Sequence, residues 1–121
     1  MNGYKFDLRV YVPLIGNGQS DQIEDQMHSF VAEEGLARFC TVKYQQPTVQ
    51  NLKNQFMHLT NYSVNKTSEN YKEEPETMDQ ILCANNGSKR TLTALFEELE
   101  QMGVDTEQIK HNIKKSCQGI M

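Results

Sequence analysis

Residues 6–12 read FDLRVYV, and apolar and polar side chains alternate along them. Positions 6, 8, 10 and 12 are apolar, while Asp7, Arg9 and Tyr11 lie between them. A period of two is typical of a strand with one buried and one exposed face. The stretch therefore predicts a strand whose exposed face carries a carboxylate and a guanidinium.

A second strand is expected over residues 38–44, RFCTVKY, which alternate in the same way. Positions 38, 40, 42 and 44 should face one way and positions 39, 41 and 43 the other. Residues 56–60 also alternate, which predicts a short extended segment.

Two helices are expected at the C-terminal end. Apolar residues recur at helical spacing at Leu92, Leu95, Phe96, Leu99 and Met102. Gly103 then stands where a left-handed C-cap is favoured. Residues 104–109, VDTEQI, supply a hydrophobic staple, a cap and a glutamine at the third helical position. A second helix should start there, with an apolar stripe at positions 109, 113 and 117.

The connections are polar or rich in turn residues. Pro13 and the following LIGNGQSDQIEDQ predict a loop, and residues 23–32 predict a short helix. Residues 47–55 are expected to be a connecting segment. Residues 65–86 are expected to be an acidic loop, which residues 85–88 close with a turn. Short strands that cover two helices indicate a mixed α/β fold resembling a slice of a larger sheet-and-helix domain.

Composition narrows the function classes. The chain has 121 residues, a net charge of −4, a pI near 5.3 and a mean hydropathy of −0.67. These values argue against non-specific binding of nucleic acid or of anionic membranes. No apolar run predicts a signal peptide or a membrane span. Three cysteines without CxxC spacing favour reduced thiols and no zinc site.

Charged side chains gather on the exposed face of the first predicted strand. Lys5, Asp7 and Arg9 share that face, and Arg38 begins the second strand. Converging guanidinium and ammonium groups suit a carboxylate or a phosphate. A solvated sheet face is the commoner explanation of the same spacing. Residues 58–66, HLTNYSVNK, are dense in hydrogen-bonding groups, which serve equally well as turn and capping residues.

Four blocks of sequence occur in a particular order: GYKFDLRVYV (3–12), EEGLARFCTVKY (33–44), NQFMHLTNYSVNK (54–66) and GSKRTL (87–92). In that order they resemble the glutamylating branch of the tubulin tyrosine ligase-like family. The resemblance implies an ATP-grasp fold, in which a nucleotide lies between two α+β subdomains. It also implies an ATP-dependent ligation that joins free L-glutamate to glutamate side chains of tubulin C-terminal tails through an acyl phosphate.

The resemblance also implies roles for individual residues. Nucleotide-contacting positions match Lys5, Asp7, His58, Thr60 and Asn61. Catalytic arginines that hold the acyl phosphate or the incoming amino acid match Arg9 and Arg38, and Arg38 is also a substrate-binding position. Glutamate-binding positions match Tyr62, Ser63 and Lys89. Developing negative charge in such a reaction requires preplaced cations and short hydrogen-bond donors.

The chain also departs from the family pattern. Residues 13–33 are expected to be an atypical insert in place of the family's apolar hairpin, and residues 1–121 a central part of a catalytic domain, incomplete at both ends. The cofactors implied are ATP and Mg²⁺, but the acidic Mg²⁺ ligands of the family are not in this sequence. No ligase activity is therefore expected from these residues alone.

An alternative is a catalytically inactive tubulin-binding fragment or short isoform. It would hold acidic tails through Lys89, Arg90 and the basic residues 110–115 at the end of the last helix. The resemblance implies a location in the cytoplasm and cytoskeleton, at microtubules. The most specific location that it implies is the cilium or basal body. No nucleic acid or membrane partner is expected.

Overall fold

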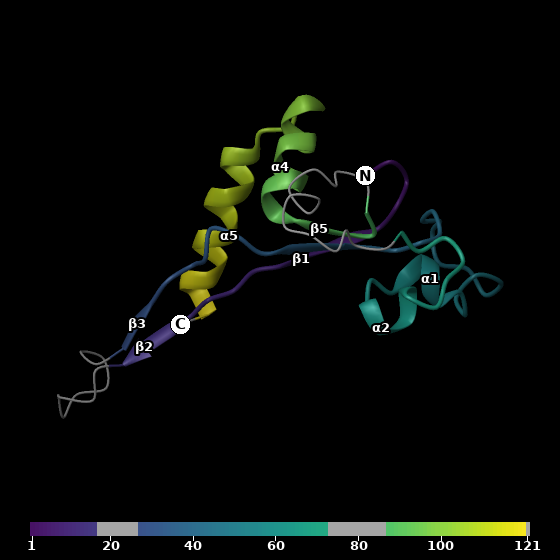
Figure 1. The fold of residues 1–121 in the computed structure, drawn as a ribbon, viewed down its shortest axis with the longest axis horizontal. Coiled ribbons are helices and arrows are strands. Elements are labelled where there is room, and N and C mark those ends of the chain that lie inside the picture. The colour runs from purple at the N-terminus through teal and green to yellow at the C-terminus, as the bar shows by residue number, and fades with distance from the viewer. Residues whose placement is uncertain (17–26, 73–86, 121) are drawn as a thin grey trace.

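A three-stranded antiparallel sheet forms the centre of the computed structural model, which describes residues 1–16, 27–72 and 87–120. The strands are β1 (Phe6–Arg9), β4 (Leu36–Phe39) and β5 (Lys89–Thr91), with β4 in the middle. The helix α4 (Leu92–Gln101) lies on one side of this sheet (Figure 1). The predicted mixed α/β fold is confirmed.

The register of the sheet sorts side chains onto two faces. Asp7 pairs with Arg38 and Arg38 with Lys89, whereas Leu8 pairs with Ala37. Since residues directly opposite each other point to the same face, Asp7, Arg38 and Lys89 share one face of the sheet. Ala37 and Phe39 lie on the other face and form the core with Leu95 of α4, and Phe6 and Leu8 pack against them.

The start of α4 is held by side-chain oxygens. The hydroxyl of Thr91 accepts a hydrogen bond from the Ala94 amide, and the Glu34 carboxylate accepts from the amides of Leu92 and Thr93. These bonds satisfy donors that the first turn of a helix leaves without partners. The helix ends before Gly103, whose φ is 80°, as predicted.

The last helix, α5 (Thr106–Ile120), also begins as predicted. The Asp105 carboxylate accepts a hydrogen bond of 3.0 Å from the Gln108 amide. The expected stripe at positions 109, 113 and 117 is half-buried. The basic residues 110–115 do not end the helix, since it continues to Ile120, so that prediction is wrong. None of the helices in the described ranges is long and apolar enough to span a bilayer.

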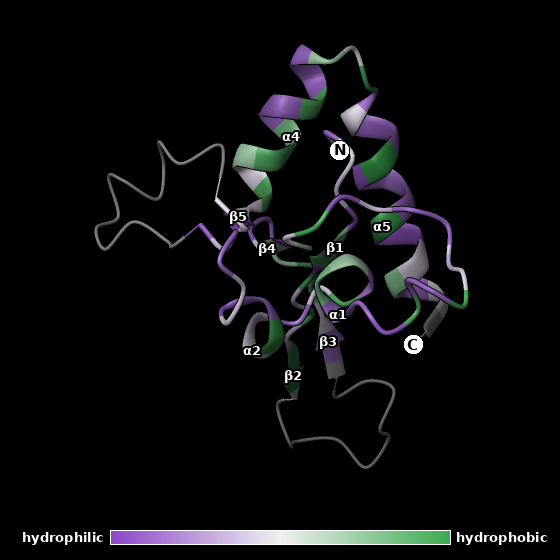
Figure 2. Cartoon of the chain, turned by 90° about the vertical axis from the view of Figure 1, so that its right-hand side faces the viewer, coloured by the Kyte–Doolittle hydropathy of each residue, from purple (hydrophilic) through white to green (hydrophobic). Residues whose placement is uncertain are grey.

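The loop and helix predicted within residues 13–32 are wrong where the structure describes them. β2 (Leu14–Gly16) and β3 (Met27–Ser29) pair as antiparallel strands that project from the body of the molecule (Figure 1). Pro13 does not stop this ribbon because its carbonyl oxygen accepts a hydrogen bond from Phe30. β2 is coloured hydrophobic in Figure 2, yet Leu14 and Ile15 are each 56% exposed. Residues 17–26 lie outside the described residues.

The strand predicted over 38–44 begins two residues earlier and ends at Phe39. It ends there because the amides of Thr41 and Val42 turn to the Phe56 carbonyl oxygen instead of continuing a ladder. Similarly, β1 ends at Arg9 rather than at position 12.

The extended segment predicted over residues 56–60 is wrong over residues 56–58, which are helical, while Leu59 has an extended backbone. The helical turns α1 (Gln55–His58) and α2 (Tyr62–Asn65) occupy this region, and β5 was not predicted. The predicted loop holds over residues 66–72, which form turns, while Asn65 belongs to α2 and residues 73–86 lie outside the described residues.

Gly35 fills a position where β1, β4 and α4 meet. A Cβ atom there would lie 2.3 Å from the Arg9 carbonyl oxygen and 2.8 Å from Leu92 Cδ1. We expect Gly35→Ala to lower the free energy of unfolding by roughly 1–3 kcal/mol or more, because backbone must shift to admit the methyl group. Urea unfolding followed by circular dichroism measures the change.

The matched control is Gly119→Ala, at a helical position with nothing within 4 Å of the added Cβ. It should keep or slightly raise stability, since alanine favours a helix over glycine by roughly 0.5–1 kcal/mol. Equal stability losses in the two variants would contradict the close approach at Gly35.

Candidate functional site

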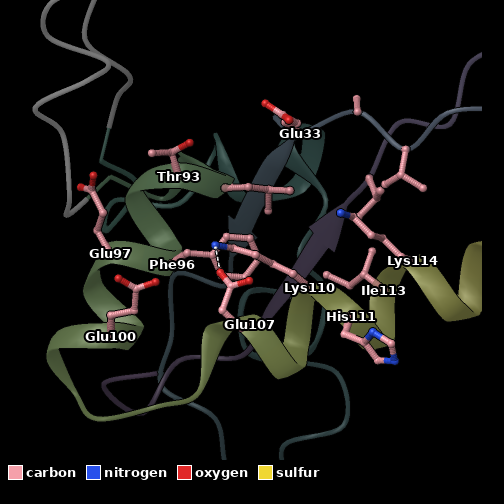
Figure 3. A pocket seen from close by; sticks show the side chains of 14 residues that line it. Glu33, Thr93, Phe96, Glu97, Glu100, Glu107, Lys110, His111, Ile113 and Lys114 are labelled. Carbon is pink, nitrogen blue, oxygen red and sulfur yellow. Dashed lines mark hydrogen bonds and ion pairs between the residues drawn. The ribbon is translucent and has the colours of Figure 1, made fainter.

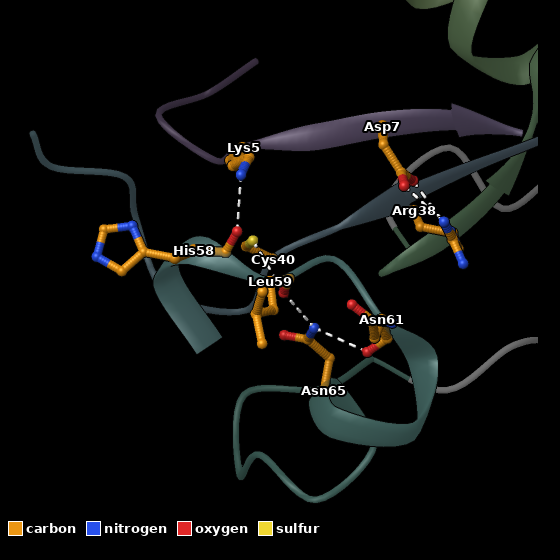
Figure 4. Close-up of polar contacts among 8 residues, drawn as sticks. All are labelled: Lys5, Asp7, Arg38, Cys40, His58, Leu59, Asn61 and Asn65. Carbon is orange, nitrogen blue, oxygen red and sulfur yellow. Dashed lines mark hydrogen bonds and ion pairs between the residues drawn. The ribbon is translucent and has the colours of Figure 1, made fainter. Parts of the chain in front are cut away.

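An ion pair between β1 and β4 organises the polar face of the sheet. Arg38 Nε and Nη2 donate to the two carboxylate oxygens of Asp7 at 3.0 and 2.5 Å (Figure 4). Such a two-point contact fixes the plane of the guanidinium. Among the described residues Arg38 donates through this edge alone, so its remaining N–H groups are available to a second anion. The side chains of Arg38 and Asp7 are 20% and 37% exposed, so the pair is reachable from solvent.

The electrostatics of Asp7 favour its charged form. Burial raises the pKa of Asp7, but hydrogen bonds from Arg38 and Thr60 and the positive charges of Arg38 and Arg9 together lower it. The same contact raises the pKa of Arg38. Asp7 therefore serves as a fixed negative charge that orients Arg38.

The Lys5 side chain meets the backbone of His58 rather than its ring. Lys5 Nζ donates to the His58 carbonyl oxygen at 2.7 Å. The His58 ring instead contacts the Asn51 carbonyl oxygen through Nε2 at 3.1 Å and lies edge-on to Tyr44. In Figure 4 the imidazole points away from Asp7 and Arg38. The structure thus brings the His58 backbone, but not its ring, to Lys5.

Asn65 holds this region together, although the sequence prediction placed it at the start of a loop. Its side chain is 1% exposed and accepts hydrogen bonds from the amide and hydroxyl of Thr41. Its amide nitrogen donates to the carbonyl oxygens of Leu59, at 2.7 Å, and of Asn61, at 3.0 Å (Figure 4). One carboxamide therefore links the end of β4 to residues 59–61. No local pattern pointed to it, because Thr41 is 24 residues away.

The segment held by Asn65 carries the other predicted site residues. Thr60 hydrogen-bonds Asp7, and Asn61 is the N-cap residue of α2 without a side-chain capping bond. Tyr62 and Ser63 are exposed on α2. Lys89 Nζ lies 5.7 Å from the centroid of the Tyr62 ring.

Most predicted site residues thus form one surface. It consists of the polar face of the sheet and the adjoining turn: Asp7, Arg9, Arg38, Thr60, Asn61, Tyr62, Ser63 and Lys89. Lys5 lies at its border, and the His58 ring faces elsewhere. Several cations around one neutralised carboxylate make this surface suited to anions such as phosphate or carboxylate.

Arg90 does not belong to this surface. It lies on the core face of β5, its guanidinium stacks 4.3 Å from the Phe39 ring centroid, and it forms an ion pair with Glu98. The expectation that Arg90 binds an acidic partner is therefore wrong, because its charge is already used inside the fold.

A separate groove of about 620 Å³ lies between α4 and α5 (Figure 3). Glu97 and Glu100 line its α4 side, and Lys110, His111 and Lys114 its α5 side. It contains none of the residues predicted to bind nucleotide or glutamate, although its α5 side belongs to the basic residues 110–115 of the tail-binding alternative. Its mixed charge favours no particular ion. No three His, Cys, Asp or Glu side chains come together as a metal site within residues 1–16, 27–72 and 87–120.

Comparison with known proteins gives consistent matches. Residues 1–119 match the model of the Tubulin-tyrosine ligase family. The chain is 44% identical over 110 residues to tubulin polyglutamylase ttll-11 of Caenorhabditis elegans, covering 91% of the chain and 14% of that protein. It is 40% identical over 114 residues to tubulin polyglutamylase ttll6 of Danio rerio, covering 94% and 13%. For tubulin polyglutamylase TTLL6 of Homo sapiens the identity is also 40%, covering 94% and 11%. The chain therefore spans less than a sixth of these relatives' lengths.

Replacing Asn65 by leucine should weaken the whole surface. Asn65→Leu keeps the number of side-chain heavy atoms but removes the acceptor of the Thr41 hydroxyl and amide and the donor to the Leu59 and Asn61 carbonyl oxygens. We expect a loss of roughly 2–3 kcal/mol in the free energy of unfolding, together with faster amide exchange at residues 59–66. The control is Asn112→Leu, an exposed position whose side chain accepts a hydrogen bond from Gln108 one turn away; an equal loss there would refute a special role for Asn65.

The Asp7–Arg38 pair should make stability depend on acid pH. Because the pKa of Asp7 is lowered in the folded protein, its stabilisation is complete above the unfolded-state pKa of roughly 4 and is lost as pH falls through the folded-state pKa. The stability difference between the parent chain and Asp7→Asn should therefore shrink below about pH 4. Urea unfolding at a series of pH values measures it, and a difference that grows on acidification would contradict the sign.

Proposed function

The chain belongs to the tubulin-tyrosine ligase family, and we propose that it is part of an ATP-dependent ligase that adds glutamate to glutamate side chains of tubulin C-terminal tails. The relatives named above are tubulin polyglutamylases, which supports glutamate as the amino acid that is added. The proposal includes action at microtubules in the cytoplasm, with the cilium as its most specific location.

The proposed reaction has two steps. The terminal phosphoryl group of ATP is transferred to a side-chain carboxylate of the tail, which gives an acyl phosphate and ADP. The amine of free glutamate then attacks the carbonyl carbon, loses a proton and displaces inorganic phosphate, so that an amide bond replaces the acyl phosphate. Both steps concentrate negative charge on oxygen atoms, which preplaced cations stabilise.

The observation that carries the proposal is the shared face of Asp7, Arg38 and Lys89 beneath the segment held by Asn65. In this proposal Lys5, Asp7, Thr60, Asn61 and the backbone of His58 contribute to the nucleotide site. Arg9 and Arg38 hold the transferred phosphate or the amino acid, and Arg38 is preoriented by Asp7. Tyr62, Ser63 and Lys89 bind free glutamate.

Mg²⁺ is part of the proposal only because membership of the family implies it. Asp7 is the one carboxylate described on this face, and its two oxygens are engaged by Arg38. The donor set of this surface therefore fits anions better than a divalent cation, and the roles given to these residues are binding and orientation of negatively charged groups.

ATP binding by the isolated chain tests the proposal. Arg9→Gln should weaken ATP affinity about tenfold, because one charge-assisted contact is lost while the Asp7–Arg38 pair stays intact. Arg38→Ala should weaken it at least as much. Titration calorimetry gives the affinity, and thermal unfolding verifies that each variant is folded.

Lys53→Gln is the control, since Lys53 is exposed in the 49–53 turn and has no role in the proposed site. If the parent chain binds no ATP, or if Lys53→Gln weakens binding as much as Arg9→Gln, the proposed nucleotide site is wrong and the inactive tail-binding alternative is favoured.

A further inference from the structure

Two lysines from different elements lie against one tyrosine at the border of the proposed site. Lys66 Nζ is 5.6 Å and Lys89 Nζ is 5.7 Å from the centroid of the Tyr62 ring. Lys66 directly follows α2 and Lys89 lies on β5, so the fold brings them together across more than 20 residues. Ammonium groups are attracted to the face of an aromatic ring, which offsets part of their mutual repulsion.

The Tyr62 ring is itself held in place. It lies edge-on to Tyr71 at a centroid distance of 5.9 Å, and the residue retains 50% exposure. Its backbone oxygen accepts a hydrogen bond from the Lys66 amide, which keeps Lys66 above the same turn. The two ammonium groups thus lie over a ring that is fixed by its own contacts, and of the two lysines Lys66 is the exposed one.

The proposed function uses only one of these two charges. Free glutamate is assigned to Tyr62, Ser63 and Lys89, and Lys66 is left over. Lys66 is exposed, and among the described carboxylates none forms an ion pair with it. A positive group next to the proposed glutamate site fits a second carboxylate, although the chain as a whole carries a charge of −4.

We propose that Lys66 binds a carboxylate of the acidic acceptor peptide, beside the glutamate that Tyr62 and Lys89 hold. This inference rests on the proposed function, because it divides the cations around Tyr62 between the amino acid and the acceptor. A glutamate-rich segment is the occupant because its repeated carboxylates complement the exposed ammonium group. The structure thereby assigns an acceptor-side residue to the same surface.

The test compares two ligands on the isolated chain, free L-glutamate and a short oligoglutamate peptide, by NMR titration at low ionic strength. Lys66→Gln should weaken the peptide about two- to fivefold, as expected for one exposed ion pair, and leave glutamate affinity unchanged. Lys66→Arg should restore peptide binding, and added salt should remove the difference. Lys89→Gln should weaken free glutamate.

Lys53→Gln and an oligoglutamine peptide are the controls. A Lys66→Gln effect no larger than that of Lys53→Gln, or an equal loss for peptide and glutamate, would overturn the acceptor role. So would an oligonucleotide that binds as well as oligoglutamate, since the surface would then be a general polyanion site. Lys66-dependent peptide binding without glutamate binding would overturn the proposed glutamate site and keep the acceptor surface; binding of neither ligand would overturn both.

Discussion

The buried carboxamide of Asn65 is the constraint on which the candidate site depends. Helical turns of four residues, such as α1 and α2, are too short to be stable by themselves. Asn65 compensates by joining Thr41, at the end of β4, to the carbonyl groups of Leu59 and Asn61. Every polar side chain from Thr60 to Ser63 is therefore presented from a segment that is tied to the central sheet rather than from a free loop.

The sheet supplies the second half of the site by separating two kinds of arginine. Arg38 points to the polar face, where Asp7 orients it and leaves part of its guanidinium available. Arg90, on the neighbouring strand, points to the core face and stacks on Phe39 while pairing with Glu98. The two residues have the same chemistry, but their side chains point to opposite faces of the sheet, since side chains alternate along each strand. The face on which each arginine lies therefore decides that one suits a ligand and the other stabilises the fold.

Several elements followed from local patterns, because their causes lie within a few residues. The cap of α5 and the positive φ of Gly103 after α4 depend on neighbouring side chains and on backbone sterics. The alternation around Asp7 and Arg9 likewise predicted a polar face. The paired strands β2 and β3 were not predicted, because each is too short to show a recognisable alternating pattern. They are held by pairing with each other, which no local sequence pattern reveals. The turns α1 and α2 were not predicted, because the alternation of residues 56–60 suggested an extended segment. The backbone of this region instead accepts hydrogen bonds from the amides at positions 41 and 42, which are distant in the sequence.

The fold class, the two C-terminal helices and the residue types of the candidate site could be predicted from the sequence, because they depend on periodicity, capping and charge. The four sequence blocks also indicated the family to which the chain belongs. Which charges meet could be learned from the folded chain alone. The tertiary structure paired Asp7 with Arg38, withdrew Arg90 into the core, turned the His58 ring toward Asn51 and brought Lys66 and Lys89 to one tyrosine. Those outcomes depend on strand register and on contacts between residues far apart in the chain, which no local pattern encodes.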